Sequence, residues 1–149
     1  MDGNTLVELL SEKNQIQKVL EMNQKTERFG LALGDEDVKL LLEKRKDVLK
    51  EQQRIEFGEG ILPKLIFTFC DSAYIYQDNY VTTIIRLQEI FYLYKNEFME
   101  ELTDDELLGF MRTAFDGVCE GSLEYLEETF LEELAHGFRS REAFCGDRK

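Results

Sequence analysis

The sequence is poor in the residues that build loops, disulfides and catalytic centres. It has one proline, one histidine and no tryptophan in 149 residues, and no Gly-, Ser- or Pro-rich tract predicts a linker. Its three cysteines are odd in number and lack C-x-x-C spacing, which argues against a disulfide framework and a zinc knuckle. No nucleophile motif surrounds the single histidine. We therefore expect no cofactor and no recognisable catalytic centre.

Basic residues are also scarce. The chain has 31 acidic and 18 basic residues, a net charge of −13, and residues 96–149 contribute −10 of it with 15 acids and 5 bases. Binding to nucleic acid phosphates or anionic membranes depends on clustered Lys and Arg, so we expect neither partner. An acidic surface favours solubility, a basic protein partner or a metal ion.

The N-terminal segment MDGNTLVELLSEK begins with an acid, and polar residues interrupt its short apolar patch. These features are typical neither of a signal peptide nor of a membrane span. We therefore expect a cytoplasmic protein.

Hydrophobic residues recur at helical spacing almost throughout, and no alternating run flanked by turn residues predicts a strand. The pattern predicts an all-α fold, a compact bundle of about six helices. We expect a single helical domain at residues 1–149, with a flexible C-terminal tail at 138–149.

An alternative arrangement is a short HEAT-like stack of helical hairpins. The expected helix caps Asp35, Asp78 and Ser122 are spaced by about 44 residues, as are the intervening helix starts near Gly60 and Thr103. Helices of ordinary length produce the same spacing without any repeat, and residue-level similarity between the units is poor. We therefore favour the irregular bundle.

In the first half of the chain, the pattern predicts a helix from Thr5 to Met22, capped by Asn4, and a second from Asp35 to about Gln53. The connection between them, residues 23–34, should bury Phe29, Leu31 and Leu33. The apolar residues expected on the core side of the two helices are Leu6, Leu9, Leu10, Ile16, Val19, Leu20, Val38, Leu41, Leu42, Val48, Leu49 and Ile55.

The stretch RIEFGEGILPKLI, residues 54–66, raises the question of a phosphate-binding loop. It follows a charged helix instead of a strand, and Glu56 and Glu59 would repel a phosphate. Pro63 is tolerated in a first helical turn, so a helix should begin near Gly58 to Gly60. The stretch is therefore predicted to be a turn between two helices, with Ile61, Leu62, Leu65, Ile66 and Phe69 buried.

In the second half, Asp78 is expected to cap a fourth helix. LTDDEL at residues 102–107 has the capping-box pattern, with Thr103 as N-cap and Glu106 three residues later. A sixth helix should follow Ser122 and stop near Gly137. The apolar residues expected to be buried are Val81, Ile84, Ile85, Phe91, Tyr92, Phe98, Leu107, Leu108, Met111, Phe115, Val118, Leu123, Leu126, Phe130, Leu131 and Leu134.

Arg45 lies on the apolar side of the second helix, three to four residues from its leucine and valine neighbours. One interpretation is an edge arginine whose stem covers apolar surface while its head reaches water, and this is the commoner case. The other is a buried ion pair with an acid from another helix, serving specificity or ligand binding. The residues we select for a ligand or partner surface are Arg45, Glu56, Tyr74 and Tyr76.

Tyr74, Tyr76 and Tyr80 cluster around the connection DSAYIYQD, residues 71–78. Exposed tyrosines at a helix junction suit a partner surface. More often, such tyrosines pack their rings and leave the hydroxyl to water or a backbone group.

Glu133-x-x-His136 has the spacing that di-metal helical bundles use. Such sites need a second copy of the motif, which this chain lacks, and His136 is offset from the apolar stripe towards solvent. A metal site at Glu133 and His136 would require a two-fold dimer and is the weakest hypothesis.

Six strings carry a family resemblance: NQKTERFGLAL, RIEFGEGILPKLI, FCDSAYI, FYLYKNE, LTDDELLGFM and GSLEYLEETFLEE. Together they resemble a small family of bacterial proteins, mostly from Gram-positive anaerobes, described as a domain of unknown function. The resemblance covers residues 23–135. It implies a bacterial cytosolic protein with an all-helical fold, and it implies no activity, cofactor or catalytic residue.

The sequence thus leaves the biochemical function unknown and favours a non-enzymatic, regulatory or protein-interaction module with an acidic surface, which binds a partner or itself. The alternative is a helical protein that binds a small molecule or a metal, including an enzyme, in a pocket between helices. Arg45, Glu56 and tyrosines would line that pocket.

Overall fold

The computed structural model describes residues 3–56, 58, 60–98 and 101–137, with side chains from residue 10 onward. Regular secondary structure in these residues is entirely helical, which confirms the all-α bundle. The tail expected at 138–149 lies outside the described residues.

The helices follow one another with short connections. The α-helices are α1 (Gly3–Leu20), α2 (Asn23–Thr26), α3 (Asp35–Glu51), α4 (Leu62–Phe69), α5 (Tyr80–Glu97), α6 (Asp104–Asp116) and α7 (Leu123–Tyr125). Two 3₁₀ turns, η1 (Glu27–Phe29) and η2 (Gln77–Asn79), precede α3 and α5, and a π-helical turn, η3 (Leu126–Phe130), follows α7. Residues 131–137 then return to α-helix.

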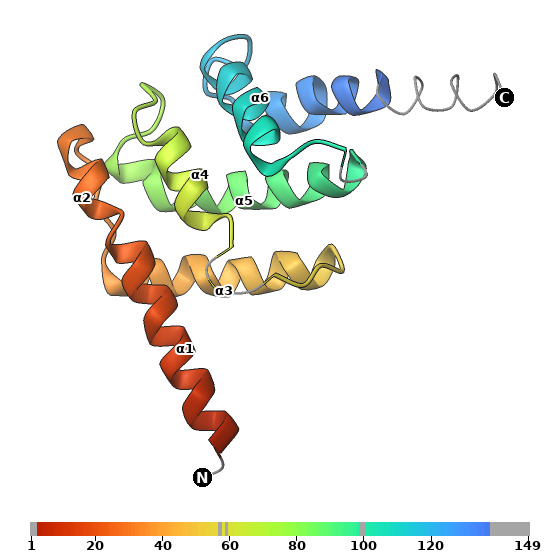
Figure 1. Ribbon diagram of the computed structural model, residues 1–149. Helices are drawn as coiled ribbons and strands as arrows, with labels where there is room; N and C mark the ends of the chain where they lie inside the picture. Colours follow the sequence, from red (N-terminus) through yellow and green to blue (C-terminus); the bar gives the residue numbers. More distant parts are fainter. Residues whose placement is uncertain (1–2, 57, 59, 99–100, 138–149) are drawn as a thin grey trace, which may run out of the picture.

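Helices α3 and α5 run side by side in the same direction (Figure 1). The Gln88 side chain donates to the carbonyl of Leu41 at 3.3 Å, and the Asn96 side chain donates to the carbonyl of Gln52 at 2.9 Å. The two contacting residues are 47 positions apart in the first contact and 44 in the second. The separation stays nearly constant along more than two helical turns only when the two helices are parallel.

Helices α4 and α6 are parallel neighbours in the same way. Lys64 meets Asp105, 41 residues later, and the carbonyl of Thr68 meets Arg112, 44 residues later. The bundle therefore consists of successive hairpins, α1 with α3, α4 with α5, and α6 with α7, whose corresponding helices lie beside one another. This is the stacking that the alternative arrangement proposed, and it occurs within the all-α bundle.

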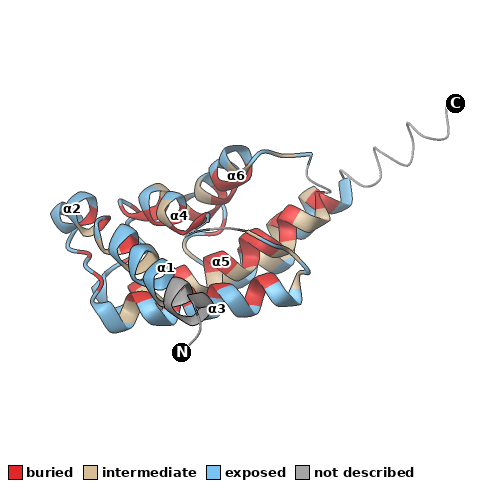
Figure 2. Cartoon of the chain, turned by 60° about the horizontal axis from the view of Figure 1, so that its bottom comes forward, coloured by how far each residue is buried: buried red, intermediate tan, exposed pale blue. Residues whose placement is uncertain are grey.

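The core lies between the first helices of these hairpins, α1, α4 and α6, and their second helices, α3, α5 and α7 (Figure 2). Most residues expected in it are buried, but Leu10, Phe29, Ile55 and Val118 are 55%, 40%, 86% and 58% exposed, so these four predictions were wrong. Ile55 and Val118 lie beyond the C-terminal ends of α3 and α6. The helical periodicity that predicted their burial therefore does not extend to them. Phe29 lies in a 3₁₀ turn with the Arg28 guanidinium 4.8 Å from its ring centre.

The helix caps expected from the sequence are confirmed at some helices and wrong at others. The Thr103 hydroxyl accepts from the amide of Glu106 at 3.1 Å, and the Glu106 carboxylate accepts in return from the amide of Thr103 at 3.0 Å, which confirms the capping box. Three expected caps were wrong. Asn4 lies inside α1, Asp35 is the first residue of α3 and follows the N-cap Gly34, and Asp78 lies inside η2, because the N-cap of α5 is Asn79, one residue later than expected.

The described residues between α3 and α4, which are 52–56, 58, 60 and 61, form the turn predicted for the stretch 54–66, and residues 62–66 begin α4. Gly58 and Gly60 have φ angles of +61° and +57°, and Pro63 lies in the first turn of α4. Left-handed backbone at these two glycines reverses the chain within a few residues and brings the segment back across the end of α3.

Candidate functional site

The structure brings Arg45 and Glu56 together. Arg45 is only 4% exposed, and its Nη2 donates to the backbone carbonyl of Glu56 at 3.3 Å. The edge-arginine interpretation was therefore wrong, because the loop after α3 folds back over the guanidinium. The other interpretation, a buried ion pair with an acid from another helix, is not confirmed either, because the acceptor is the backbone carbonyl of Glu56 in that loop.

Glu56 is held from two other directions. The Tyr92 hydroxyl on α5 donates to Oε2 of Glu56 at 2.8 Å, and Nη2 of Arg54 lies 3.7 Å from Oε1. Burial, together with the hydrogen bond to the negatively charged Glu56, raises the pKa of Tyr92, so this hydroxyl stays protonated and acts as a donor. The carboxylate of Glu56 is therefore already engaged.

A surface pocket of ≈ 370 Å³ opens beside these residues at the C-terminal end of α3. Helix α1, helix α3 and the loop after α3 all contribute to it, and four of its side chains are cationic. The lining residues are Gln15, Arg45, Lys46, Leu49, Lys50, Arg54, Ile55, Glu56 and Gly58.

Gly60 allows this arrangement. A Cβ at this position would lie 2.6 Å from Nη2 of Arg45 and 3.0 Å from Oε2 of Glu56. Only glycine therefore combines the left-handed backbone with such a close approach to the Arg45 head. The sequence showed the need for unusual backbone angles here but not which side chain the glycine would face.

Tyr74 and Tyr76 do not line this pocket. The Tyr74 ring packs edge-on against Phe115, with centroids 6.0 Å apart, and it lies so close to Gly121 that a Cβ there would be 2.6 Å from the ring. Tyr76 is 59% exposed. The tyrosine that reaches Glu56 is Tyr92, which the sequence pattern marked only as a core residue. No signal in the sequence marked Tyr92 as the donor to Glu56.

Glu133 and His136 are both exposed on the last described helical turns. In the part of the chain that the structure describes, no group of three or more His, Cys, Asp or Glu residues is placed to hold a metal ion. Among the residues that the structure describes, the single-copy motif thus gains no further ligand.

A second, smaller pocket of ≈ 290 Å³ lies near η1 and α4, where aromatic and basic side chains meet. Its lining residues are Arg28, Phe29, Phe67, Thr68, Cys70, Asp71 and Arg112. Phe67 is 56% exposed, and the Lys25 ammonium lies 5.2 Å from its ring centre. Burial raises the pKa of the Cys70 thiol, which is typical of a structural and unreactive cysteine.

Arg112 closes one side of this smaller pocket and ties α6 to α4. Its Nη1 donates to the carbonyl of Thr68 and to Asp71, both at 2.5 Å, and its Nε donates to Asp116 at 2.6 Å. Hydrogen bonding to Arg112 lowers the pKa of Asp71. The Nη1 and Nε groups of Arg112 are thus both engaged in structural contacts.

The π-helical turn η3 is fastened to α5. The Tyr94 hydroxyl donates to the carbonyl of Glu127 at 2.5 Å and to Glu132 at 3.2 Å, and Arg86 binds the Glu127 carboxylate. Burial, followed by the charge of Glu132, raises the pKa of Tyr94. These contacts hold the π-helical turn against α5.

The fold and these sites define a small all-helical protein of stacked hairpins with a basic pocket at the end of α3. The chain belongs to a family of unknown function, DUF6323, whose sequence model matches residues 18–143. Searches of the curated proteins and of the solved structures returned no match. Over the described residues, none of the helices combines the length and the apolar character required to cross a bilayer.

Proposed function

We propose that this chain is a non-enzymatic, bacterial cytoplasmic module that forms one domain over residues 1–149 and binds a protein partner. The observation that carries the proposal is a row of exposed phenylalanines on the helices α4 and α6 and the turn η1. Phe29, Phe67 and Phe110 are 40%, 56% and 44% exposed. We call this set the phenylalanine row.

Phe67 and Phe110 occupy corresponding positions of α4 and α6. Contacts between these parallel helices join residues 41 to 44 positions apart, and Phe67 and Phe110 are separated by 43. Exposed aromatic side chains that gather on one face mark interaction surfaces, and aromatic residues dominate the binding energy of many interfaces.

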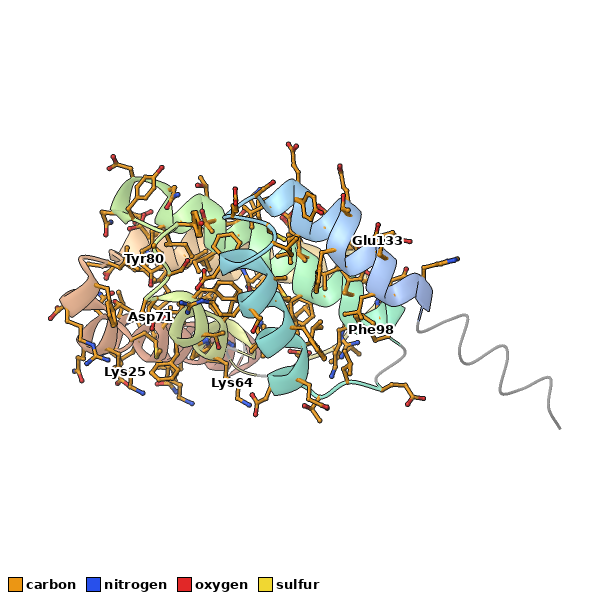
Figure 3. The ribbon with its side chains drawn as sticks, turned by 90° about the horizontal axis from the view of Figure 1, so that it is seen from above. Lys25, Lys64, Asp71, Tyr80, Phe98 and Glu133 are labelled. Atoms are coloured by element: carbon orange, nitrogen blue, oxygen red, sulfur yellow. The ribbon has the colours of Figure 1, made fainter. Side chains whose placement is uncertain are left out.

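The surroundings of the row indicate the chemistry of the partner. Lys25 and Lys64 lie along the same edge of the molecule, whereas Glu133 lies on the opposite side (Figure 3). Arg28 lines the pocket between Phe29 and Phe67. A partner that inserts an apolar side chain and carries nearby acidic groups would be complementary to this face.

The test is co-purification with the tagged full-length chain, comparing wild type with the double variant Phe67→Ala/Phe110→Ala. The control is Leu40→Ala/Tyr125→Ala, which also removes two exposed apolar side chains, at 39% and 41% exposure, away from the row. We expect the first variant to lose the partner and the control to retain it. Equal recovery by both variants would contradict the proposal, and light scattering after size exclusion would show whether the partner is a second copy.

A second candidate function is the binding of a small molecule. The pocket at Arg45 favours it, because a buried guanidinium and a carboxylate converge there with an open volume beside them.

A further inference from the structure

The pocket at the end of α3 has a charge opposite to that of the protein. Four of its lining residues are cationic and one is acidic, so its formal charge is 4 − 1 = +3, against −13 for the whole chain. Local positive charge in an acidic protein concentrates anions at that point and repels cations. The cationic residues are Arg45, Lys46, Lys50 and Arg54.

Arg45 has unused hydrogen-bonding capacity inside this pocket. Its side chain is buried, its Nη2 donates to the Glu56 carbonyl, and its Nε has no hydrogen-bond partner among the residues that the structure describes. A guanidinium carries five N–H donors in a planar fork. A buried cation without sufficient partners is unstable unless an anion or another acceptor completes its bonding.

Glu56 does not supply that anion. Its carboxylate accepts from Tyr92 and lies near Arg54, and within the described parts of the chain no ion pair at 4.0 Å or less joins it to Arg45. Arg45 donates instead to the backbone carbonyl of Glu56, which is a neutral acceptor. The Glu56 carboxylate thus lies near the guanidinium without pairing with it, and among the described residues the Nε–H of Arg45 keeps an unused hydrogen bond.

We propose that this pocket binds a small organic anion through a carboxylate or phosphate group. The guanidinium of Arg45 supplies charge-assisted hydrogen bonding to such a group, and Lys46 and Lys50 add charge at the opening. Leu49 and Ile55 line the same volume and contact the apolar part of the ligand. The volume of ≈ 370 Å³ is within the range of about 300–1,000 Å³ typical of small-molecule sites.

The test follows the Arg45 Nε–H resonance in nitrogen-correlated NMR spectra of the full-length chain, assigned by its loss in Arg45→Lys. The probes are inorganic phosphate, butyrate and the neutral analogue butyramide, at matched ionic strength. We expect phosphate, butyrate or both to shift this resonance saturably, and butyramide to leave it unchanged. The anion that binds more tightly identifies the preferred group.

Matched charge variants complete the test. Lys46→Ala/Lys50→Ala removes two charges from the pocket, whereas Lys39→Ala/Lys44→Ala removes two exposed charges of the same helix outside it. We expect the first pair to weaken anion binding roughly three- to tenfold, as loss of two partly solvated ion pairs should, and the second to change it less than about twofold. Absence of any anion-dependent shift, equal binding of butyramide, or equal weakening by both pairs would overturn the proposal.

Discussion

The Tyr92 hydroxyl donates a 2.8 Å hydrogen bond to Oε2 of Glu56 and so fastens the loop after α3 to the middle of α5. Tyr92 is fully buried, and the Glu56 side chain is 23% exposed. The same residue, Glu56, offers its backbone carbonyl to Arg45. One hydrogen bond from the core thus positions the loop that covers the guanidinium.

Tyr92→Phe should lower the free energy of unfolding by about 2 kcal/mol, because hydrogen bonds to charged groups contribute about 1.5–3 kcal/mol. Urea denaturation measures the change. Tyr76→Phe is the control, since Tyr76 is 59% exposed, and it should change stability by less than about 0.5 kcal/mol. Similar effects of the two substitutions would show that the Glu56 bond contributes nothing.

Gly60→Ala should destabilise the protein more than Gly58→Ala. Both glycines have positive φ, which costs a residue with a Cβ about 1–2 kcal/mol. Only at Gly60 does the added Cβ meet other atoms, at 2.6 Å from Arg45 Nη2, whereas the space at Gly58 is open. The extra loss should be accompanied by a shift of the Arg45 Nε–H resonance in Gly60→Ala alone. Equal losses in denaturation, with no such shift, would contradict the close approach.

The sequence predicted local features well because they depend on neighbouring residues. The Thr103 capping box, the turn at Gly58 and Gly60, and the start of α3 at Asp35 are all set within a few positions. Arg45 could be selected because it lies in the apolar stripe of α3, but its contact with Glu56, 11 residues later in the loop, was not predicted.

Features that depend on the register between helices could not be predicted. Tyr92 lies in the apolar stripe of α5, where the pattern does not distinguish a hydroxyl with a partner from an ordinary core ring. Tyr74 and Tyr76 were grouped with Arg45 although the connection that carries them packs elsewhere, against Phe115. The phenylalanine row likewise emerges only when α4 and α6 are set side by side.

Alkaline pH should destabilise the fold through buried tyrosines. Burial raises the pKa of Tyr80 to about 12, from an ordinary value of 10.0. Below pH 10 both states hold the proton; between pH 10 and 12 the unfolded state loses it while the folded state keeps it, so the free energy of unfolding falls as pH rises. Denaturation at a series of pH values measures the slope.

Tyr80→Phe isolates the contribution of this residue. The slope above pH 10 should become shallower, and stability near neutral pH should stay unchanged or increase. The second effect follows because the Tyr80 hydroxyl is buried and makes no hydrogen bond of good geometry among the described residues; its neighbour, the Thr26 hydroxyl, donates to the carbonyl of Leu31. A large loss near neutral pH would instead reveal a bond that this hydroxyl makes.

Arg112→Met should weaken the contact between α6 and α4 and so destabilise the protein. It removes the bonds to the Thr68 carbonyl, Asp71 and Asp116 while keeping an apolar stem, and a loss of about 1–3 kcal/mol is expected. The pKa of Asp71, which Arg112 lowers below its ordinary 3.8, should return towards that value. The stability from this pair exists above pH 3.8 and is lost as pH falls further, so the variant should lose that part of the acid dependence. Carboxyl NMR titration of Asp71 is the measurement, and an unchanged pKa would refute the assignment.

Thr103→Ala should remove the capping box of α6. The substitution deletes the hydroxyl that accepts from the Glu106 amide at 3.1 Å, and loss of such a cap costs about 1 kcal/mol. Thr113→Ala is the matched control, because it makes the same chemical change at an exposed position inside the same helix, where alanine has the higher helix propensity. Urea denaturation should therefore show destabilisation for the first variant and no loss for the second. If both variants lost the same stability, the loss would come from replacing any threonine of this region. The reciprocal bonds between Thr103 and Glu106 would then not be what fixes the start of α6.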